Sequence, residues 1–168
     1  MSDHLEFKAA LAVDDAGLIT GTAWPFGTPD RVGDLIEKGA FAGAAAPLPM
    51  LAFHDAADPV GTWTAIEETG AGLMVKGKLL VDEVARAREI RALVVSGAVG
   101  GLSIGFRTRK AEPRKGGGRT IKALELVEIS LVTVPAHPGA RVTSAKSAAE
   151  AIRIAEAIHR ATAALKRV

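Results

Sequence analysis

The segment Gly101-Leu102-Ser103-Ile104-Gly105-Phe106 offers the residue type and setting of a serine nucleophile. Such a serine needs an exposed Oγ and nearby backbone N–H groups for an oxyanion, and flanking glycines let the backbone approach a substrate. The segment also matches the GxSxG elbow of α/β-hydrolases, which requires a strand before the serine and a helix after it. Here a helical pattern precedes Ser103 and an extended pattern follows, so we predict that it is not an elbow. Taken alone, the segment favours a small structural serine at a β-bulge over a nucleophile.

His54 is a candidate for the base that a serine nucleophile needs within hydrogen-bond reach. It ends the apolar segment Leu51-Ala52-Phe53-His54-Asp55, where a histidine is more often structural than catalytic. His4 and His159 lie in terminal segments, which leaves His54 and His137 as the two bases near the predicted core. His137 lies between two prolines, a pattern that favours a rigid turn, and His54 is therefore the stronger candidate.

Glu128 lies inside the apolar run from Leu124 to Val132. A charged carboxylate buried without a partner costs several kcal/mol, so we expect it to be paired. A histidine partner would remove this cost and would itself be oriented by the carboxylate, as in a catalytic triad. An ion pair with an arginine is the alternative. Asp55 is a weaker third member, because adjacent strand residues point to opposite faces, and His137 also remains open.

The composition indicates one soluble domain with a substantial core. The 168 residues are 48% hydrophobic and 24% charged, and no apolar run approaches the length of a membrane span. The N-terminus lacks the pattern of a signal peptide, which favours the cytoplasm. Without cysteine there is no disulfide, Cys nucleophile or thiolate site, and neither CxxC nor HExxH occurs. With a net charge of only +2, we expect no nucleic-acid partner. The four histidines and the missing motifs predict no metal site, the short apolar runs predict no membrane segment, and no cofactor is expected.

Alternating apolar residues predict a chain composed mainly of strands. The expected strands are 5–13, 18–24, 50–54, 60–67, 72–80, 102–108 and 121–134, with a hairpin turn at Asp14-Asp15-Ala16-Gly17. Loops are expected at 25–33 and at the basic, glycine-rich segment 110–119.

Helical spacing is confined to three segments. Residues 82–96 form the clearest helix, with Asp82 able to cap its start and Gly97 able to end it. Residues 36–46 are alanine-rich enough for one or two helical turns, and 143–168 form an amphipathic helix. The predicted fold is α+β, mainly β: a mostly antiparallel β-barrel (1–142) surrounded by a few helices. The C-terminal helix (143–168) is part of the same domain or an assembly segment.

Several short blocks, in this order, resemble the tailed-bacteriophage prohead (capsid maturation) protease family. The blocks are Gly21-Thr22-Ala23-Trp24-Pro25-Phe26, Asp30-Arg31-Val32-Gly33-Asp34, Gly39-Ala40-Phe41, Met50-Leu51-Ala52-Phe53-His54, Pro59-Val60-Gly61-Thr62-Trp63, Gly72-Leu73, Gly101 to Phe106, and Glu128 to Pro138. Each is modest alone, but the ordered set is specific and spans about residues 20 to 142.

This resemblance implies the fold of the herpesvirus assemblin proteases and a serine endopeptidase. It implies that Ser103 is the nucleophile and His54 the base. Assemblins use a second histidine as third member, and the strand expected to carry it bears Glu128 here, so that role is assigned to Glu128. Backbone support for the oxyanion would come from Gly101, Leu102 and Ile104. Arg141 is a weaker candidate for the arginine that helps hold this site in assemblins.

The resemblance also implies substrates and a place of action. The substrates would be the scaffolding protein or scaffolding segment of the major capsid protein, and the protease itself. The place would be assembling procapsids in the bacterial cytoplasm, and a homodimer is possible for this family. Phage, prophage and gene-transfer particles are equally compatible origins. The alternatives are an inactive capsid-assembly protein of the same fold and an unrelated small GxSxG hydrolase.

Overall fold

Eight strands and one helix make up the part of the chain that the computed structural model describes, residues 13–143. The elements are β1 (Leu18–Pro25), β2 (Leu35–Ile36), β3 (Leu48–Ala52), β4 (Pro59–Glu68), β5 (Gly72–Leu79), α1 (Ala85–Val95), β6 (Gly101–Pro113), β7 (Arg119–Val132) and β8 (Arg141–Thr143). The expected strand at 5–13 and the expected helix at 143–168 lie almost entirely outside these residues.

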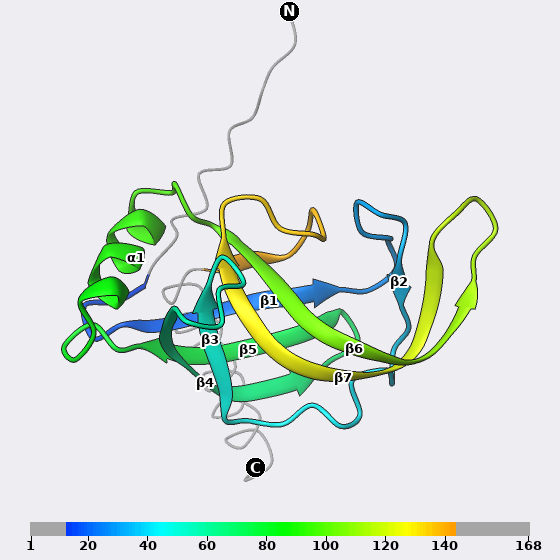
Figure 1. Ribbon diagram of the computed structural model, residues 1–168, viewed down its shortest axis with the longest axis horizontal. Coiled ribbons are helices and arrows are strands. Elements are labelled where there is room, and N and C mark those ends of the chain that lie inside the picture. The colour runs from blue at the N-terminus through cyan, green and yellow to red at the C-terminus, as the bar shows by residue number, and fades with distance from the viewer. Residues whose placement is uncertain (1–12, 144–168) are drawn as a thin grey trace, which may run out of the picture.

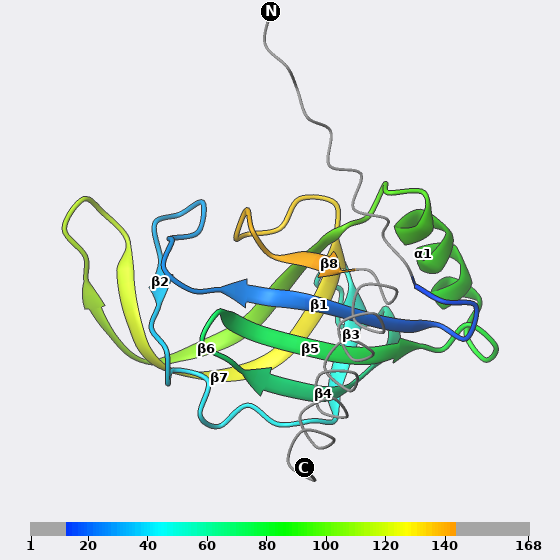
Figure 2. The same cartoon turned by 180° about the vertical axis from the view of Figure 1, so that it is seen from behind.

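Seven strands close into a barrel. The order is β7-β3-β4-β5-β1-β8-β6, and β6 pairs again with β7 to complete the circle. Most neighbours are antiparallel, whereas β3 and the short β2 run parallel to β7. Helix α1 lies at one end of the barrel and the turn between β6 and β7 lies at the other (Figures 1 and 2). The predicted mainly-β, mostly antiparallel barrel is confirmed.

The barrel interior is filled by alternate residues of its strands. Trp24, Trp63, Leu73, Leu102 and Ile129 are among the fully buried side chains. The indole N–H of Trp63 donates to the Ile129 carbonyl at 2.9 Å, so this ring packs in the core without losing its hydrogen bond. This interaction joins β4 to β7 beside the strand pair that carries Ser103.

Strands β6 and β7 form a hairpin longer than the sequence pattern predicted. Their pairing runs from Gly101 opposite Val132 to Pro113 opposite Arg119. The loop expected at 110–119 is therefore wrong, because only residues 114–118 form the turn. Charged side chains face solvent here, and the Lys122 ammonium lies 2.6 Å from the Glu112 carboxylate across the two strands. Cross-strand ion pairs of this kind stabilise an exposed hairpin. They do not produce the alternation of apolar and polar residues from which strands were predicted.

Helix α1 and the segment before β3 correct two further predictions. Val84 is the N-cap of α1 and no side chain caps it, so Asp82 is not the cap; Gly97, at φ +81°, ends the helix as predicted. Residues 36–46 form no α-helix: Ile36 ends β2 and turns follow. The Glu68 carboxylate accepts hydrogen bonds from the N–H groups of Gly39 and Phe41, which holds these turns to β4.

The Asp30–Asp34 block has a structural role beside β7. Asp30 Oδ1 accepts from the N–H groups of Val32 and Asp34 at 3.0 and 2.9 Å, which closes a turn. Asp34 is buried and paired with Arg119, whose backbone N–H also donates to Asp34 Oδ1 at 3.0 Å. The hydrogen bonds from Arg119 hold the pKa of Asp34 below its ordinary value against the effect of burial. This pair fixes β2 to the start of β7.

Candidate active site

The β6–β7 register places Ser103 and Glu128 on one face of the hairpin. Ser103 pairs with Ser130, and two residues along Gly105 pairs with Glu128. Because alternate residues of a strand share a face and paired residues lie opposite each other, these four positions form one local group. Two residues that are 25 positions apart in sequence are thereby neighbours in space.

His54 approaches the same group from the other side of β7. Strand β3 runs parallel to β7, with Ala52 opposite Leu131, and the chain then turns sharply. Phe53 and His54 adopt φ of 54° and 63°, a left-handed conformation that is strained for residues other than glycine. The N–H of Phe53 donates to the Leu131 carbonyl at 3.0 Å, and that of His54 donates to Ser130 Oγ at 3.1 Å. These bonds anchor the turn to β7.

His54 and Glu128 form a charge-assisted hydrogen bond. His54 Nδ1 lies 2.7 Å from Glu128 Oε1, and Ser130 Oγ donates to Glu128 Oε2 at 2.6 Å. An ionised carboxylate only accepts hydrogen bonds, so Nδ1 carries the proton and Nε2 of neutral His54 is left with a lone pair. The partner of Glu128 is thus a histidine and not an arginine. This is the tautomer that a general base requires.

The Glu128 hydrogen bond raises the pKa of His54 above 6.5, with a further contribution from the charge of Glu128 and against the effect of burial. The folded state therefore binds this proton more tightly than the unfolded chain does. Its contribution to the free energy of unfolding is complete below pH 6.5 and is lost as the pH rises through the raised pKa. In an NMR titration, we expect the imidazole resonances of His54 to have a midpoint above 6.5. A midpoint at or below 6.5 would contradict the pairing.

Ser103 lies within β6, which continues as a strand to Pro113. The strand continues directly after the serine in place of the helix that the α/β-hydrolase elbow requires there, so the elbow is excluded, as predicted. The residue is 4% exposed, and its hydroxyl forms no hydrogen bond with any residue in the described range 13–143, His54 included. Both residues nevertheless adjoin Ser130, which pairs with Ser103 across the two strands and accepts a hydrogen bond from the backbone N–H of His54.

Gly105 makes room for the Glu128 side chain. A Cβ built at Gly105 would overlap Glu128 Oε1 and would lie 2.9 Å from its Cδ and Cγ. The sequence had suggested that the glycines around Ser103 allow a substrate to approach. The structure gives each a neighbour within the protein, since a Cβ at Gly101 would lie 2.7 Å from Pro135 Cδ.

We therefore expect Gly105→Ala to displace the Glu128 carboxylate from His54. The NMR midpoint of His54 should fall toward 6.5, because the hydrogen bond that raises it would be broken or lengthened. Gly43→Ala is a matched control, because a Cβ at Gly43 meets nothing within 4 Å. A Gly105→Ala protein whose His54 titrates as in the wild type would show that Glu128 can move aside without leaving His54.

The residues expected to support an oxyanion lie around the start of β6. The N–H of Leu102 donates to the Ala140 carbonyl at 3.3 Å and is therefore already engaged. Gly101 pairs with both Val132 and Arg141, and Ile104 pairs with Ile129. The Arg141 side chain is exposed, and its Nη1 donates to Ala140 O at 3.0 Å. Their oxyanion role stays a prediction.

The two alternative third members are engaged elsewhere. Asp55 Oδ1 accepts from the Ala57 N–H at 2.8 Å, which closes the turn after His54. His137 is buried; its Nε2 lies 3.0 Å from the Thr28 carbonyl, and its Nδ1 accepts from the Gly139 N–H at 3.0 Å. Its ring meets Trp24 edge-on, with ring centroids 4.8 Å apart. Both residues hold turns, and within residues 13–143 neither side chain forms a hydrogen bond with Glu128.

Ser130 is the residue of this group that sequence reasoning did not select. The sequence shows it inside an apolar run and inside the block from Glu128 to Pro138, and neither setting gives it a role of its own. The available signal was its spacing, because a serine two positions from a buried glutamate must lie on the same strand face.

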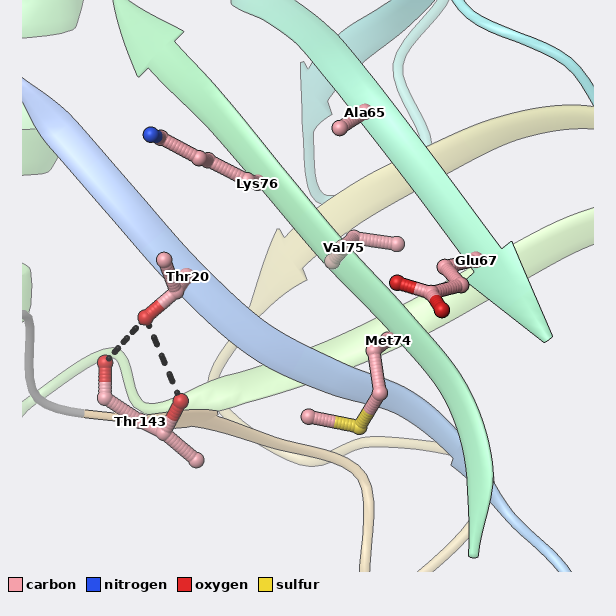
Figure 3. A pocket seen from close by; sticks show the side chains of 7 residues that line it. All are labelled: Thr20, Ala65, Glu67, Met74, Val75, Lys76 and Thr143. Carbon is pink, nitrogen blue, oxygen red and sulfur yellow. Dashed lines mark hydrogen bonds between the residues drawn. The ribbon is translucent and has the colours of Figure 1, made fainter. Parts of the chain in front are cut away.

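A shallow pocket on the barrel wall is separate from this group. Figure 3 shows its lining of Thr20, Ala65, Glu67, Met74, Val75, Lys76 and Thr143. The Thr20 and Thr143 hydroxyls lie 3.3 Å apart along one side. Within residues 13–143, no three His, Asp or Glu side chains are grouped to bind a metal, and no helix is long and apolar enough to cross a membrane.

The sequence matches the family described as caudovirus prohead serine protease over residues 4–153. The chain belongs to this family. The capsid polyprotein of Pseudomonas phage PAJU2 is 37% identical over 150 residues, which are 85% of this chain and 22% of that protein. The prohead protease of Enterobacteria phage HK97 is 34% identical over 141 residues, 78% of this chain and 61% of that protein. The chain thus spans less than two thirds of each of these relatives.

Two solved structures have a fold similar to that of this prohead protease family member. The KSHV protease in complex with a hexapeptide phosphonate inhibitor superposes with a TM-score of 0.56 at 13% identity, covering 74% of this chain and 63% of that one. The capsid assembly protease gp21 of bacteriophage T4 superposes with a TM-score of 0.53 at 15% identity, covering 68% and 80%. The predicted assemblin-like fold is confirmed.

Proposed function

We propose that this protein is a serine endopeptidase with Ser103 as nucleophile, His54 as base and Glu128 as the residue that orients the base. The observation that carries the proposal is the hydrogen bond between His54 Nδ1 and Glu128, which leaves Nε2 free to accept a proton. Membership of a prohead serine protease family supports the reaction class. The missing hydrogen bond between His54 and Ser103 is compatible with this role, because such bonds often form only when substrate is bound.

The reaction proceeds through an acyl-enzyme. His54 Nε2 takes the Ser103 Oγ proton as Oγ attacks the peptide carbonyl, and the imidazolium formed is stabilised by Glu128. That proton passes to the leaving amine, and the carbonyl carbon remains esterified to Ser103. A water molecule then attacks the ester with His54 again as base and restores the free serine. Because His54 must be neutral, cleavage should rise with pH through the raised pKa of His54.

The substrates proposed are the scaffolding protein, or a scaffolding segment of the major capsid protein, and the protease itself. The names of the relatives support this: one is a capsid polyprotein, another a prohead protease, and a structural neighbour is a capsid assembly protease. Cleavage would take place inside procapsids assembling in the bacterial cytoplasm. There, confinement raises the local concentration of substrate, as linkage does in a multivalent complex.

Coexpression with the cognate scaffolding and major capsid proteins tests this function. We expect the wild-type chain to produce new N-termini in these proteins, detected by mass spectrometry. A fluorophosphonate probe, applied to the assembled particles, should attach to the peptide containing Ser103. Particles that assemble with all components intact and take up no probe would favour an inactive assembly protein. Labelling at another serine would reject Ser103 as nucleophile.

A further inference from the structure

Ser130 occupies the centre of the candidate site with both sides of its hydroxyl engaged. It is 0% exposed, and its Oγ donates to Glu128 Oε2 at 2.6 Å. The same oxygen accepts the backbone N–H of His54 at 3.1 Å. One hydroxyl therefore contacts the acidic member of the proposed triad and the backbone of the basic member. It also lies directly opposite the proposed nucleophile, since Ser130 pairs with Ser103.

We infer that Ser130 is a positioning residue that sets the geometry of the His54–Glu128 pair, an inference that rests on the proposed function. A glutamate side chain has three rotatable bonds, and its hydrogen bond to His54 fixes only one of its oxygens. The bond from Ser130 fixes the other, so the carboxylate plane cannot rotate freely. A charged acceptor makes this hydrogen bond stronger than one between neutral groups.

The second contact of Ser130 acts on the backbone. Phe53 and His54 are held in left-handed conformations, and such strain persists only where surrounding contacts enforce it. Two hydrogen bonds to β7 enforce it here, and one of them ends on Ser130 Oγ. Loss of the hydroxyl would remove one of these two hydrogen bonds. The backbone at His54 would then be less restrained, and its ring would be held less closely in the orientation that binds Glu128.

Ser130 is poorly placed to be a nucleophile itself. Its proton is donated to Glu128, its oxygen already accepts a hydrogen bond, and the residue is fully buried. Ser103 Oγ, in contrast, has no hydrogen-bond partner among the described residues. The two serines, one on each strand, therefore have different roles: Ser103 is available for reaction and Ser130 is committed to holding its neighbours.

The test compares the full-length wild type with Ser130→Ala and Ser130→Thr. Two quantities are measured: the rate of fluorophosphonate labelling at Ser103, and the NMR titration midpoint of His54. We expect Ser130→Ala to label about 10- to 100-fold more slowly, the size expected for losing a hydrogen bond to a charged group. Its His54 midpoint should fall toward 6.5. Ser130→Thr keeps the hydroxyl and should recover most of both values.

Ile121→Val controls for a general loss of core packing. Ile121 is a fully buried residue of β7 that pairs with β2. This variant should be slightly less stable but should label at the wild-type rate with an unchanged His54 midpoint. If Ser130→Ala does not fold, Ser130→Cys provides the comparison, because a thiol of similar shape is a weak donor; slower labelling and a lower His54 midpoint are then expected.

The outcomes separate this inference from the proposed function. A folded Ser130→Ala or Ser130→Cys that labels like the wild type, with an unchanged His54 midpoint, would overturn the positioning role and leave the protease intact. A wild type that neither labels nor cleaves would overturn the proposed function. In that case a His54 midpoint that still falls in Ser130→Ala would support the positioning of the His54–Glu128 pair alone.

Discussion

Replacing Ser103 by alanine is expected to abolish cleavage of the capsid and scaffolding proteins. Removing the nucleophile of a serine protease lowers kcat by about 10⁶-fold, because no acyl-enzyme can form and only oxyanion binding and substrate orientation remain. Mass spectrometry of particles coexpressed with Ser103→Ala should therefore find both proteins intact. The fluorophosphonate adduct on the peptide containing this position should also be absent.

The loss should occur without a change in fold. The Ser103 hydroxyl makes no hydrogen bond within residues 13–143, so alanine leaves no buried partner unsatisfied there. We expect the melting temperature to stay within about 3 °C and the His54 NMR midpoint to stay above 6.5, since removing one small buried hydroxyl that has no partner among these residues should change stability by only about 0.5 kcal/mol. Ser96→Ala is the matched control, because Ser96 is exposed at the end of α1. This variant should be fully active.

Cleavage that survives in Ser103→Ala would contradict the assignment and point to another nucleophile. If neither the wild type nor Ser103→Ala cleaves, while both support assembly, the chain is an inactive assembly protein of the same fold. These two results differ from a folding defect, because the His54 titration and the melting temperature report on the fold independently of activity.

The barrel could be predicted from sequence because its strands alternate apolar and polar residues. β4 and β5 were located to within a residue or two by this pattern, and Gly97 marked the end of α1. The extent of the β6–β7 hairpin could not be predicted, since residues 107–113 and 119–123 pair through the backbone while their side chains, Ile121 apart, are exposed or half-buried. Nor could β2, which is two residues long and depends on Asp34 and Arg119.

The candidate site was predictable where burial conflicts with charge. Glu128 was identified because a carboxylate in an apolar strand must have a partner, and that partner is His54. The left-handed backbone at Phe53 and His54 could not be predicted, because a positive φ is uncommon for any residue other than glycine, and the enrichment of histidine in this conformation does not extend to Phe53. The role of Gly105 could not be predicted either. Gly105 leaves space for a side chain 23 residues later in the sequence, and only the strand register shows that the two are neighbours.

Replacing Glu128 by glutamine is expected to lower the cleavage rate by about 10⁴-fold, the size seen when the acidic member of a serine-protease triad becomes an amide. Glutamine has nearly the same shape, so the barrel should stay folded. If its amide group faces His54, it donates to Nδ1, and the ring proton moves to Nε2, which then cannot accept the Ser103 proton. If its carbonyl faces His54, the tautomer is kept, but the imidazolium formed during reaction loses its negative partner.

The His54 titration separates this effect from a general disturbance of β7. Because Glu128 raises the pKa of His54, the midpoint in Glu128→Gln should fall toward 6.5, and any residual cleavage should extend to lower pH. Glu125→Gln is the matched control, because Glu125 lies on the same strand but pairs with Arg107 and Arg109, away from His54. This variant should leave both the cleavage rate and the His54 midpoint unchanged.

A fully active Glu128→Gln would mean that His54 is oriented by another group. Asp55→Asn and His137→Gln would then be the next variants to compare, although the structure engages both residues in turns. Loss of activity in Glu128→Gln with an unchanged His54 midpoint would place the function of Glu128 in substrate binding and not in orienting the base.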